Sequence, residues 1–169
     1  LRLSLNGQQF TALGEVVYGF GRPMTVLGLS PSSGPVEGNT HVTVQGMHMA
    51  NGSDYLCKFG DLPLVAAVAY GSAMTCVAPP SHGVTGPLRL EVTSNGQQYT
   101  EDQLVYVYYG PVNATHLDPV AGPVFGGTLV SVFGRDLDMG SDPRCSFGSQ
   151  VGVHATFVHA GLLDAPDSN

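Results

Sequence analysis

Charged residues are scarce in this sequence, and cations are the scarcest of all. Of its 169 residues only 11% are charged, with 6 Lys plus Arg against 13 Asp plus Glu and a formal net charge of −7. Proteins that bind nucleic acids need cations to release counterions from the phosphates, and anionic membrane surfaces attract the same side chains. The cations here form no run, which argues against binding to DNA, RNA or an anionic membrane; they are Arg2, Arg22, Lys58, Arg89, Arg135 and Arg144.

Long hydrophobic runs and catalytic signatures are missing as well. No stretch of about 18 apolar residues occurs, which excludes direct membrane insertion by a helix of this segment. Residues 1–6 alternate and lack the apolar region of a signal peptide, so we interpret the chain as part of a longer protein. Phosphate-binding loops, zinc-protease motifs and nucleophile elbows are absent, and Gly19-Phe20-Gly21 lacks the rest of a dinucleotide motif. We therefore expect no enzyme activity and no cofactor.

Turn-forming residues, in contrast, are abundant. The chain has 23 Gly and 12 Pro, and its 43% of hydrophobic residues is too many for a disordered protein. Residues 40–45, 88–93 and 103–108 alternate apolar and polar side chains with the period of two that strands show, for example at Val42 and Val44. Asn-Gly pairs, which supply the positive φ of tight hairpin turns, occur at 6–7, 51–52 and 95–96. The pattern predicts an all-β protein built as a β-sandwich.

One stretch of sequence occurs twice, 88 positions apart. Residues 30–46 align with residues 118–134 without a gap, and the matches include Pro, Gly, Val and Thr. The same offset pairs CKFG at 57–60 with CSFG at 145–148. A repeat of about 88 residues is long enough to bury a core of its own, so we expect tandem domains rather than the short units of a solenoid.

The repeat divides the chain into three parts. Residues 1–23 are expected to be the C-terminal end of a preceding repeat, because their NGQQF sequence recurs as NGQQY near the end of the next one. Residues 24–110 are expected to form a complete domain, and residues 111–169 an incomplete following domain. No Gly/Ser-rich tether separates these parts, and Pro111 stiffens the joint by fixing its φ. Neighbouring domains should therefore hold a defined relative angle.

Five segments of the middle repeat resemble the IPT/TIG family. They are LSPSSGPVEGNT at 29–40, VTVQG at 42–46, CKFG at 57–60, MTCVAPP at 74–80 and VYVY at 105–108. IPT/TIG domains occur in plexins, transcription factors and other proteins. The resemblance implies tandem early-set immunoglobulin-like β-sandwiches, with functions from receptor and adhesion stalks to DNA binding and accessory roles in starch-acting enzymes. The fold alone therefore does not define the function.

The resemblance also implies a disulfide between Cys57 and Cys76, because extracellular members of the family often carry one at these positions. Closing a loop of about 20 residues would stabilise the fold by ~3 kcal/mol through chain entropy. Two buried free thiols are the alternative. Cys145 matches Cys57, but Leu163 stands where its partner would be. Cys145 is therefore expected to be unpaired and buried, or paired outside this segment.

Two N-glycosylation sequons begin at Asn51 and Asn113, with the sequences NGS and NAT. Both are expected at turns or joints, where a glycan can be accommodated. Together with the cysteine pair, they indicate an oxidising, extracellular setting.

Metal-binding patterns are few. Asp136, Asp138 and Asp142 lie in one loop and are a candidate for weak calcium binding, although calcium needs six to eight oxygen ligands. The equivalent loop of the middle repeat keeps only Asp54, so a solvated loop is the other interpretation. The six histidines, of which His159 is the last, are dispersed and lack the spacing of a zinc site.

These observations favour a non-catalytic structural and interaction segment of a large extracellular or cell-surface glycoprotein. Its expected partners are other protein chains, or further repeats of the same protein, in a filament or surface coat. The excess of Arg over Lys, with abundant Gly, Val and Pro, resembles proteins of GC-rich genomes such as those of green algae, and suggests a ciliary surface as one home. The alternative is an accessory glycan-binding domain of a polysaccharide-active enzyme. Against it, the chain has no Trp, and Tyr106 and Tyr108 share a strand face where core packing is expected.

Overall fold

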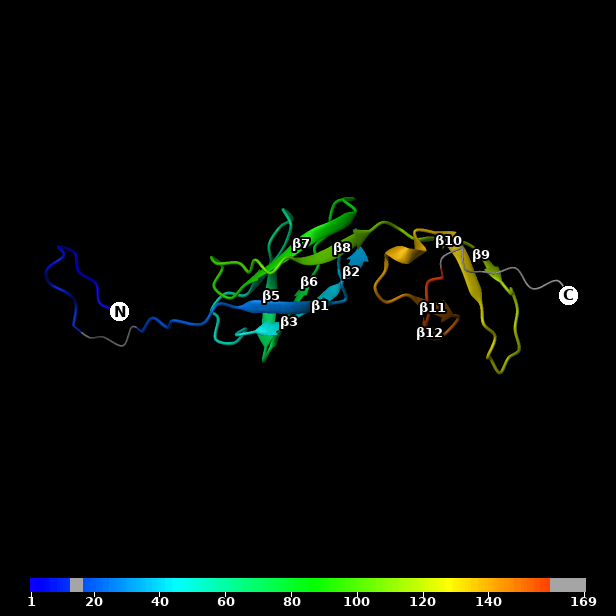
Figure 1. Cartoon of the computed structure of the whole chain (residues 1–169), viewed down its shortest axis with the longest axis horizontal. Helices are drawn as coiled ribbons and strands as arrows, with labels where there is room; N and C mark the ends of the chain where they lie inside the picture. Colours follow the sequence, from blue (N-terminus) through cyan, green and yellow to red (C-terminus); the bar gives the residue numbers. More distant parts are fainter. Residues whose placement is uncertain (13–16, 159–169) are drawn as a thin grey trace.

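The computed structural model describes residues 1–12 and 17–158, and this part of the chain is almost entirely β-structure (Figure 1). Its single helix is the short 3-10 helix η1. The all-β prediction is therefore confirmed. The elements are β1 (Thr25–Ser30), β2 (Ser33–Pro35), β3 (His41–Met47), β4 (Leu56–Phe59), β5 (Val65–Tyr70), β6 (Ala73–Val77), β7 (Gly86–Thr93), β8 (Leu104–Tyr109), β9 (Asn113–Asp118), β10 (Ser131–Arg135), η1 (Leu137–Met139), β11 (Arg144–Phe147) and β12 (Gln150–His154).

Strands β1–β8 form the central sandwich, a continuous sheet in the order β1-β3-β6-β5-β4-β7-β8-β2. Strand β5 joins its two halves, because residues 65–66 pair with β4 whereas residues 67–70 pair with β6. All neighbours are antiparallel except β2 and β8. The chain can therefore fold the β1-β3-β6 half over the β4-β7-β8 half and enclose a core between them.

The core of the central sandwich follows the alternation read in the sequence. Val42 and Val44 of β3 are buried, while His41 and Gln45 on the other face are exposed. The same alternation holds in β7 and β8, so the predicted strand faces are confirmed. The buried hydrophobic residues come from both halves of the sheet and are Val26, Val42, Val44, Met49, Cys57, Phe59, Met74, Cys76, Ala78, Leu90, Val92, Tyr106 and Tyr108.

Strands β9–β12, the C-terminal unit, repeat the pairing of β1, β3, β4 and β5. β9 pairs with β10 as β1 pairs with β3, and a β-bulge occurs at corresponding positions. β11 pairs with β12 as β4 pairs with β5. Matched pairs differ by 88 in both residue numbers; examples are Leu29–Val44 with Leu117–Val132, and Cys57–Val65 with Cys145–Val153. The repetition seen in the sequence is thus also a repetition of strand register.

Residues 1–12 contain a copy of the turn between β7 and β8. The side-chain carbonyls of Asn6 and Asn95 each accept hydrogen bonds from the backbone N–H groups two and three residues later. The hydroxyls of Thr11 and Thr100 each accept a hydrogen bond of 3.1 Å from the backbone N–H eight residues earlier. Short loops of Asn and Gly adopt such turns readily. The two NGQQ segments, at 6–9 and 95–98, therefore share the same turn hydrogen bonds.

One expectation needs correction, and one stays a prediction. The Asn-Gly pair at 51–52 is not a hairpin turn, because β3 and β4 belong to different halves of the sheet and do not pair. Asn51 itself takes the positive φ, at 68°. Cys145 has no disulfide partner among the described residues and is partly exposed there, so its burial in a complete domain, or its pairing outside this segment, stays a prediction. In the described residues, β9–β12 have no opposing half to cover them, and Leu163, the position matched to Cys76, lies outside the described residues.

Candidate functional site

The central sandwich is closed by a disulfide between Cys57 of β4 and Cys76 of β6. Both cysteines are buried in the core, and their Cα atoms are 6.5 Å apart. Because β5 separates β4 from β6, the disulfide spans the strand that joins the two halves of the sheet. This bond therefore holds the halves together at the fold-over point.

Both sequons lie on accessible backbone. Asn51 is exposed in the loop between β3 and β4, and Asn113 is exposed as the first residue of β9. Asn113 also follows the three-residue connection from β8. A glycan on either side chain would extend into solvent beside a junction between parts of the chain.

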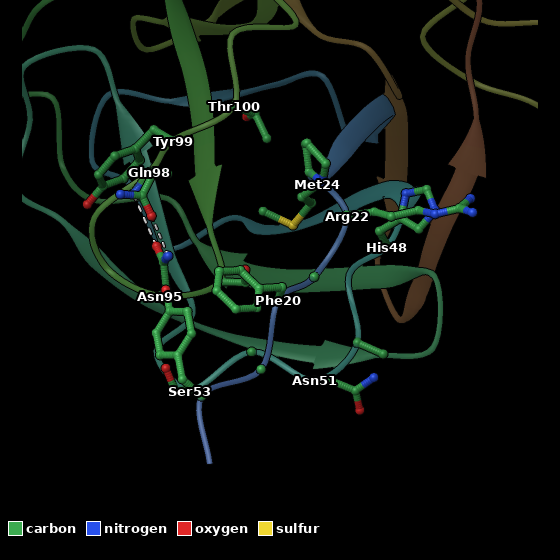
Figure 2. Close-up of a pocket in the computed structure, with 17 residues that line it drawn as sticks. Phe20, Arg22, Met24, His48, Asn51, Ser53, Asn95, Gln98, Tyr99 and Thr100 are labelled. Atoms are coloured by element: carbon green, nitrogen blue, oxygen red, sulfur yellow. Dashed lines mark hydrogen bonds between the residues drawn. The ribbon is translucent and has the colours of Figure 1, made fainter. Parts of the chain in front are cut away.

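A groove of about 900 Å³ lies at the end of the central sandwich where the chain enters β1 (Figure 2). One wall is the segment 18–24, and the others are the β3–β4 loop at 48–53 and the β7–β8 loop at 94–100. Phe20 lies in the middle of the groove, whereas the side chain of Asn51 points away from it. Tyr18, Phe20 and Tyr99 lie on its walls, and we consider the groove as a candidate binding site for that reason.

The aromatic wall of the groove has a counterpart in the core. The rings of Tyr18 and Phe20 form an edge-to-face pair with centroids 5.0 Å apart at 75°. Tyr106 and Tyr108, 88 residues later, form an edge-to-face pair at 5.0 Å and 78°. The second pair is buried, but Tyr18 is 67% and Phe20 is 93% exposed. The same arrangement of two aromatic rings thus lies on the wall of a groove at residues 18 and 20 and inside the core at residues 106 and 108.

A polar contact joins the central sandwich to the C-terminal unit. The hydroxyl of Ser33, in β2, donates to the hydroxyl of Ser141 over 3.0 Å and accepts the backbone N–H of Ser141 at 2.8 Å. Sequence reasoning did not identify this contact. No local pattern could have found it, because the two serines lie 108 residues apart in the chain.

The three carboxylates proposed for calcium are not brought together in the described residues. Among the described residues, no group of three His, Cys, Asp or Glu side chains is arranged to hold a metal ion. Asp142 instead forms an ion pair of 2.9 Å with Arg144, and the hydrogen bond from Arg144 lowers the pKa of Asp142. Asp136 is the left-handed residue before η1 and Asp138 lies inside it, so neither joins Asp142 in a cluster. His159 lies outside the described residues.

The central sandwich also has an ion pair on its surface, between a lysine of β4 and a glutamate of β7. Lys58 and Glu91 lie opposite each other on β4 and β7 and form an ion pair of 2.9 Å. The hydrogen bond to Glu91 raises the pKa of Lys58.

In the described part of the chain, no helix has the length and apolarity needed to cross a membrane.

The strand order and the disulfide define an immunoglobulin-like β-sandwich. The sequence model of the IPT/TIG domain matches residues 24–108, so the chain belongs to the IPT/TIG family.

Within that family, the chain is similar to plexins. It is 28% identical to human plexin-A2 over 139 residues and 28% identical to human plexin-A4 over 136 residues. Zebrafish (Danio rerio) plexin A3 is 26% identical over 137 residues. Each alignment covers 80% of this chain and 7% of the relative, so the chain spans a small part of their length. The solved extracellular region of plexin A4 matches with a TM-score of 0.51 and 25% identity, over 70% of this chain and 10% of that one.

Proposed function

We propose that this chain is a non-catalytic structural and interaction segment of a multi-domain extracellular or cell-surface glycoprotein. In this proposal residues 1–23 end one IPT/TIG repeat, residues 24–110 form a complete domain and residues 111–169 begin the next. The repeats act as a stiff scaffold or stalk that sets distance and angle. Further repeats, or other protein chains in a surface assembly, are the partners.

The observation that carries the proposal is the direct succession of two equivalent units. Strand β8 ends at Tyr109 and β9 begins at Asn113, which leaves three residues between them, one of which is Pro111. The contact between Ser33 and Ser141 adds a fixed point beside this connection. A connection this short, with a proline and a side contact, restricts the swing of one unit on the other.

The cell-surface setting is supported by the disulfide, the two sequons and the similarity to an extracellular plexin region. These observations say nothing of cilia, so the proposal stops at the cell surface.

The alternative, a glycan-binding accessory domain, would need the aromatic groove as its platform. Tyr18 and Phe20, however, occupy the positions of the core residues Tyr106 and Tyr108 in the adjacent repeat. We therefore favour the scaffold.

Distance measurements between the two units test the scaffold. Spin labels are placed at Val68 of β5 and Val151 of β12, which are 73% and 82% exposed, in the full-length protein carrying Cys145→Ser. A narrow distribution of distances by pulsed electron resonance is expected, because the units share a short, proline-containing joint.

The control inserts a Gly/Ser segment between Gly110 and Pro111, which should broaden the distribution. An equally broad distribution without the insertion would show a swivelling joint and would refute the stiff scaffold.

A further inference from the structure

The groove at residues 18–24, 48–53 and 94–100 has the shape of a ligand site, but its aromatic wall argues for another occupant. Tyr18 and Phe20 reproduce the ring geometry of Tyr106 and Tyr108. In the central sandwich, the later pair packs on Phe59 and is buried. Exposing two aromatic rings costs the hydrophobic free energy that burial of comparable rings supplies. The pair at 18 and 20 is therefore suited to the core of the repeat that residues 1–23 end.

The chain between that pair and the central sandwich is very short. Four residues, 21–24, separate Phe20 from the first residue of β1. The five Cα–Cα steps from Phe20 to Thr25 reach roughly 18 Å when fully extended. A domain that buries Phe20 must therefore lie against the end of the central sandwich that carries the groove.

The C-terminal unit shows how such neighbours meet. The β10–β11 loop, which contains Ser141, reaches back to Ser33 at the far end of the central sandwich. The β3–β4 loop is its equivalent, since His48 and Asp136 both have a φ of 59° and Ser53 corresponds to Ser141. The backbone N–H of Ser53 already donates to the Ser94 carbonyl at 2.9 Å. Its exposed hydroxyl is the group left to meet a neighbour.

We propose that the groove is a seam closed by the preceding repeat of the same polypeptide. Tyr18 and Phe20 turn into the core of that repeat, and the Ser53 hydroxyl meets its residue corresponding to Ser33. Ser53 is also the last residue of the Asn51 sequon, whose asparagine points away from the groove (Figure 2). A glycan on Asn51 therefore stands at the rim of the seam and does not block it. This inference rests on the proposed tandem arrangement, and it names the surface through which the central sandwich would contact the preceding repeat.

Tyrosine modification in the unmutated full-length protein tests the seam directly. Tetranitromethane nitrates accessible tyrosines, and peptide mapping compares Tyr18 with Tyr70, which is 89% exposed on β5. The seam predicts that Tyr18 reacts at least about tenfold more slowly than Tyr70, as a core tyrosine does. Equal rates would overturn the proposal.

Cysteine pairing tests the loop contact. In full-length protein carrying Cys145→Ser, Ser53→Cys is combined with a cysteine at the position of the preceding repeat that corresponds to Ser33. Asn51→Cys with the same partner is the matched control, because it lies in the same loop, points outward and also removes the NGS sequon. Disulfide formation should be roughly tenfold faster for Ser53→Cys, since a held contact raises effective concentration.

The outcomes separate the seam from the scaffold. Equal pairing rates, together with a narrow distance distribution across the Gly110–Pro111 joint, would refute the seam and leave the stiff scaffold standing. A broad distribution at that joint would refute the scaffold whatever the seam does.

Discussion

At the residue scale, the sandwich is organised around three aromatic rings. Phe59 packs edge-to-face on Tyr106 and on Tyr108, with centroids 5.3 Å and 6.4 Å away. The two tyrosines have different polar surroundings. The Tyr108 hydroxyl donates to the Pro79 carbonyl at 2.7 Å, whereas the buried Tyr106 hydroxyl has only the Thr40 side chain beside it, in a geometry that falls short of a full hydrogen bond. Two neighbouring tyrosines should therefore respond differently to loss of the hydroxyl.

Removing each hydroxyl gives a matched pair of variants. We expect Tyr108→Phe to lower the free energy of unfolding by roughly 1–2 kcal/mol, because it breaks a buried hydrogen bond and leaves a carbonyl without its donor. Tyr106→Phe should leave it unchanged or raise it, since no full hydrogen bond is lost and a buried hydroxyl that is costly to desolvate is removed. Denaturant unfolding of both variants measures the difference. Equal losses would contradict the assignment.

Alkaline pH should destabilise the sandwich through the same rings. Burial raises the pKa of Tyr106 and of Tyr108, so the folded state holds these protons more tightly than the unfolded state. The free energy of unfolding should be steady below the ordinary tyrosine pKa of about 10 and fall as pH rises above it. Unfolding curves at a series of pH values measure this decline.

A shallower decline in Tyr108→Phe identifies its source, because Lys58 and Glu91 are unchanged in that variant. A slope that is the same in both proteins would show that Tyr108 is not responsible.

At the element scale, β5 is the decisive strand. Its first residues pair with β4 and its later residues with β6, so a strand of six residues links both halves of the sheet. Only two residue pairs hold it to β4. The disulfide between Cys57 and Cys76 reinforces this narrow connection from both sides.

Removal of the disulfide should therefore be costly. We expect Cys57→Ala with Cys76→Ala to lower the free energy of unfolding by ~3 kcal/mol, the chain-entropy value for a loop of about this length. Chemical denaturation under non-reducing conditions measures it. Cys145→Ser is the control and should be near neutral, because this cysteine is partly exposed and has no disulfide partner among the described residues. A neutral double variant would show that the halves hold together without the bond.

At the scale of the whole molecule, repetition dominates. The central sandwich and the C-terminal unit follow one another along the long axis of the structure (Figure 1). Residues 1–12 reproduce a turn of the sandwich, and Tyr18 and Phe20 reproduce its buried ring pair. A net charge of −7 with few cations makes binding to polyanions electrostatically unfavourable.

Glycosylation is the molecular property that tests the cellular setting. When the protein is secreted from a eukaryotic host, glycosidase should lower its intact mass, and Asn51→Gln and Asn113→Gln should each remove one glycan. Both asparagines are exposed, so an enzyme can reach them. Protein without glycan on either residue, and with free thiols at Cys57 and Cys76, would argue against an extracellular location.

Much of this architecture follows from the sequence because its signals are local. Period-two alternation needs only neighbouring residues, and it placed Val42, Val44, Tyr106 and Tyr108 in the core. The 88-residue offset compares the chain with itself, and equal sequences adopted equal registers.

Only the tertiary structure decided which strands pair and which surfaces meet. Pairing depends on contacts between residues far apart in the chain, where local pattern carries no information. For this reason Asn51-Gly52 lies in a loop that connects the two halves of the sheet and not in a hairpin. For the same reason the hydrogen bond between Ser33 and Ser141 joins residues 108 positions apart. The exposure of a side chain also depends on residues far away in the chain. An aromatic side chain such as Phe20 is buried only where an opposing sheet covers it.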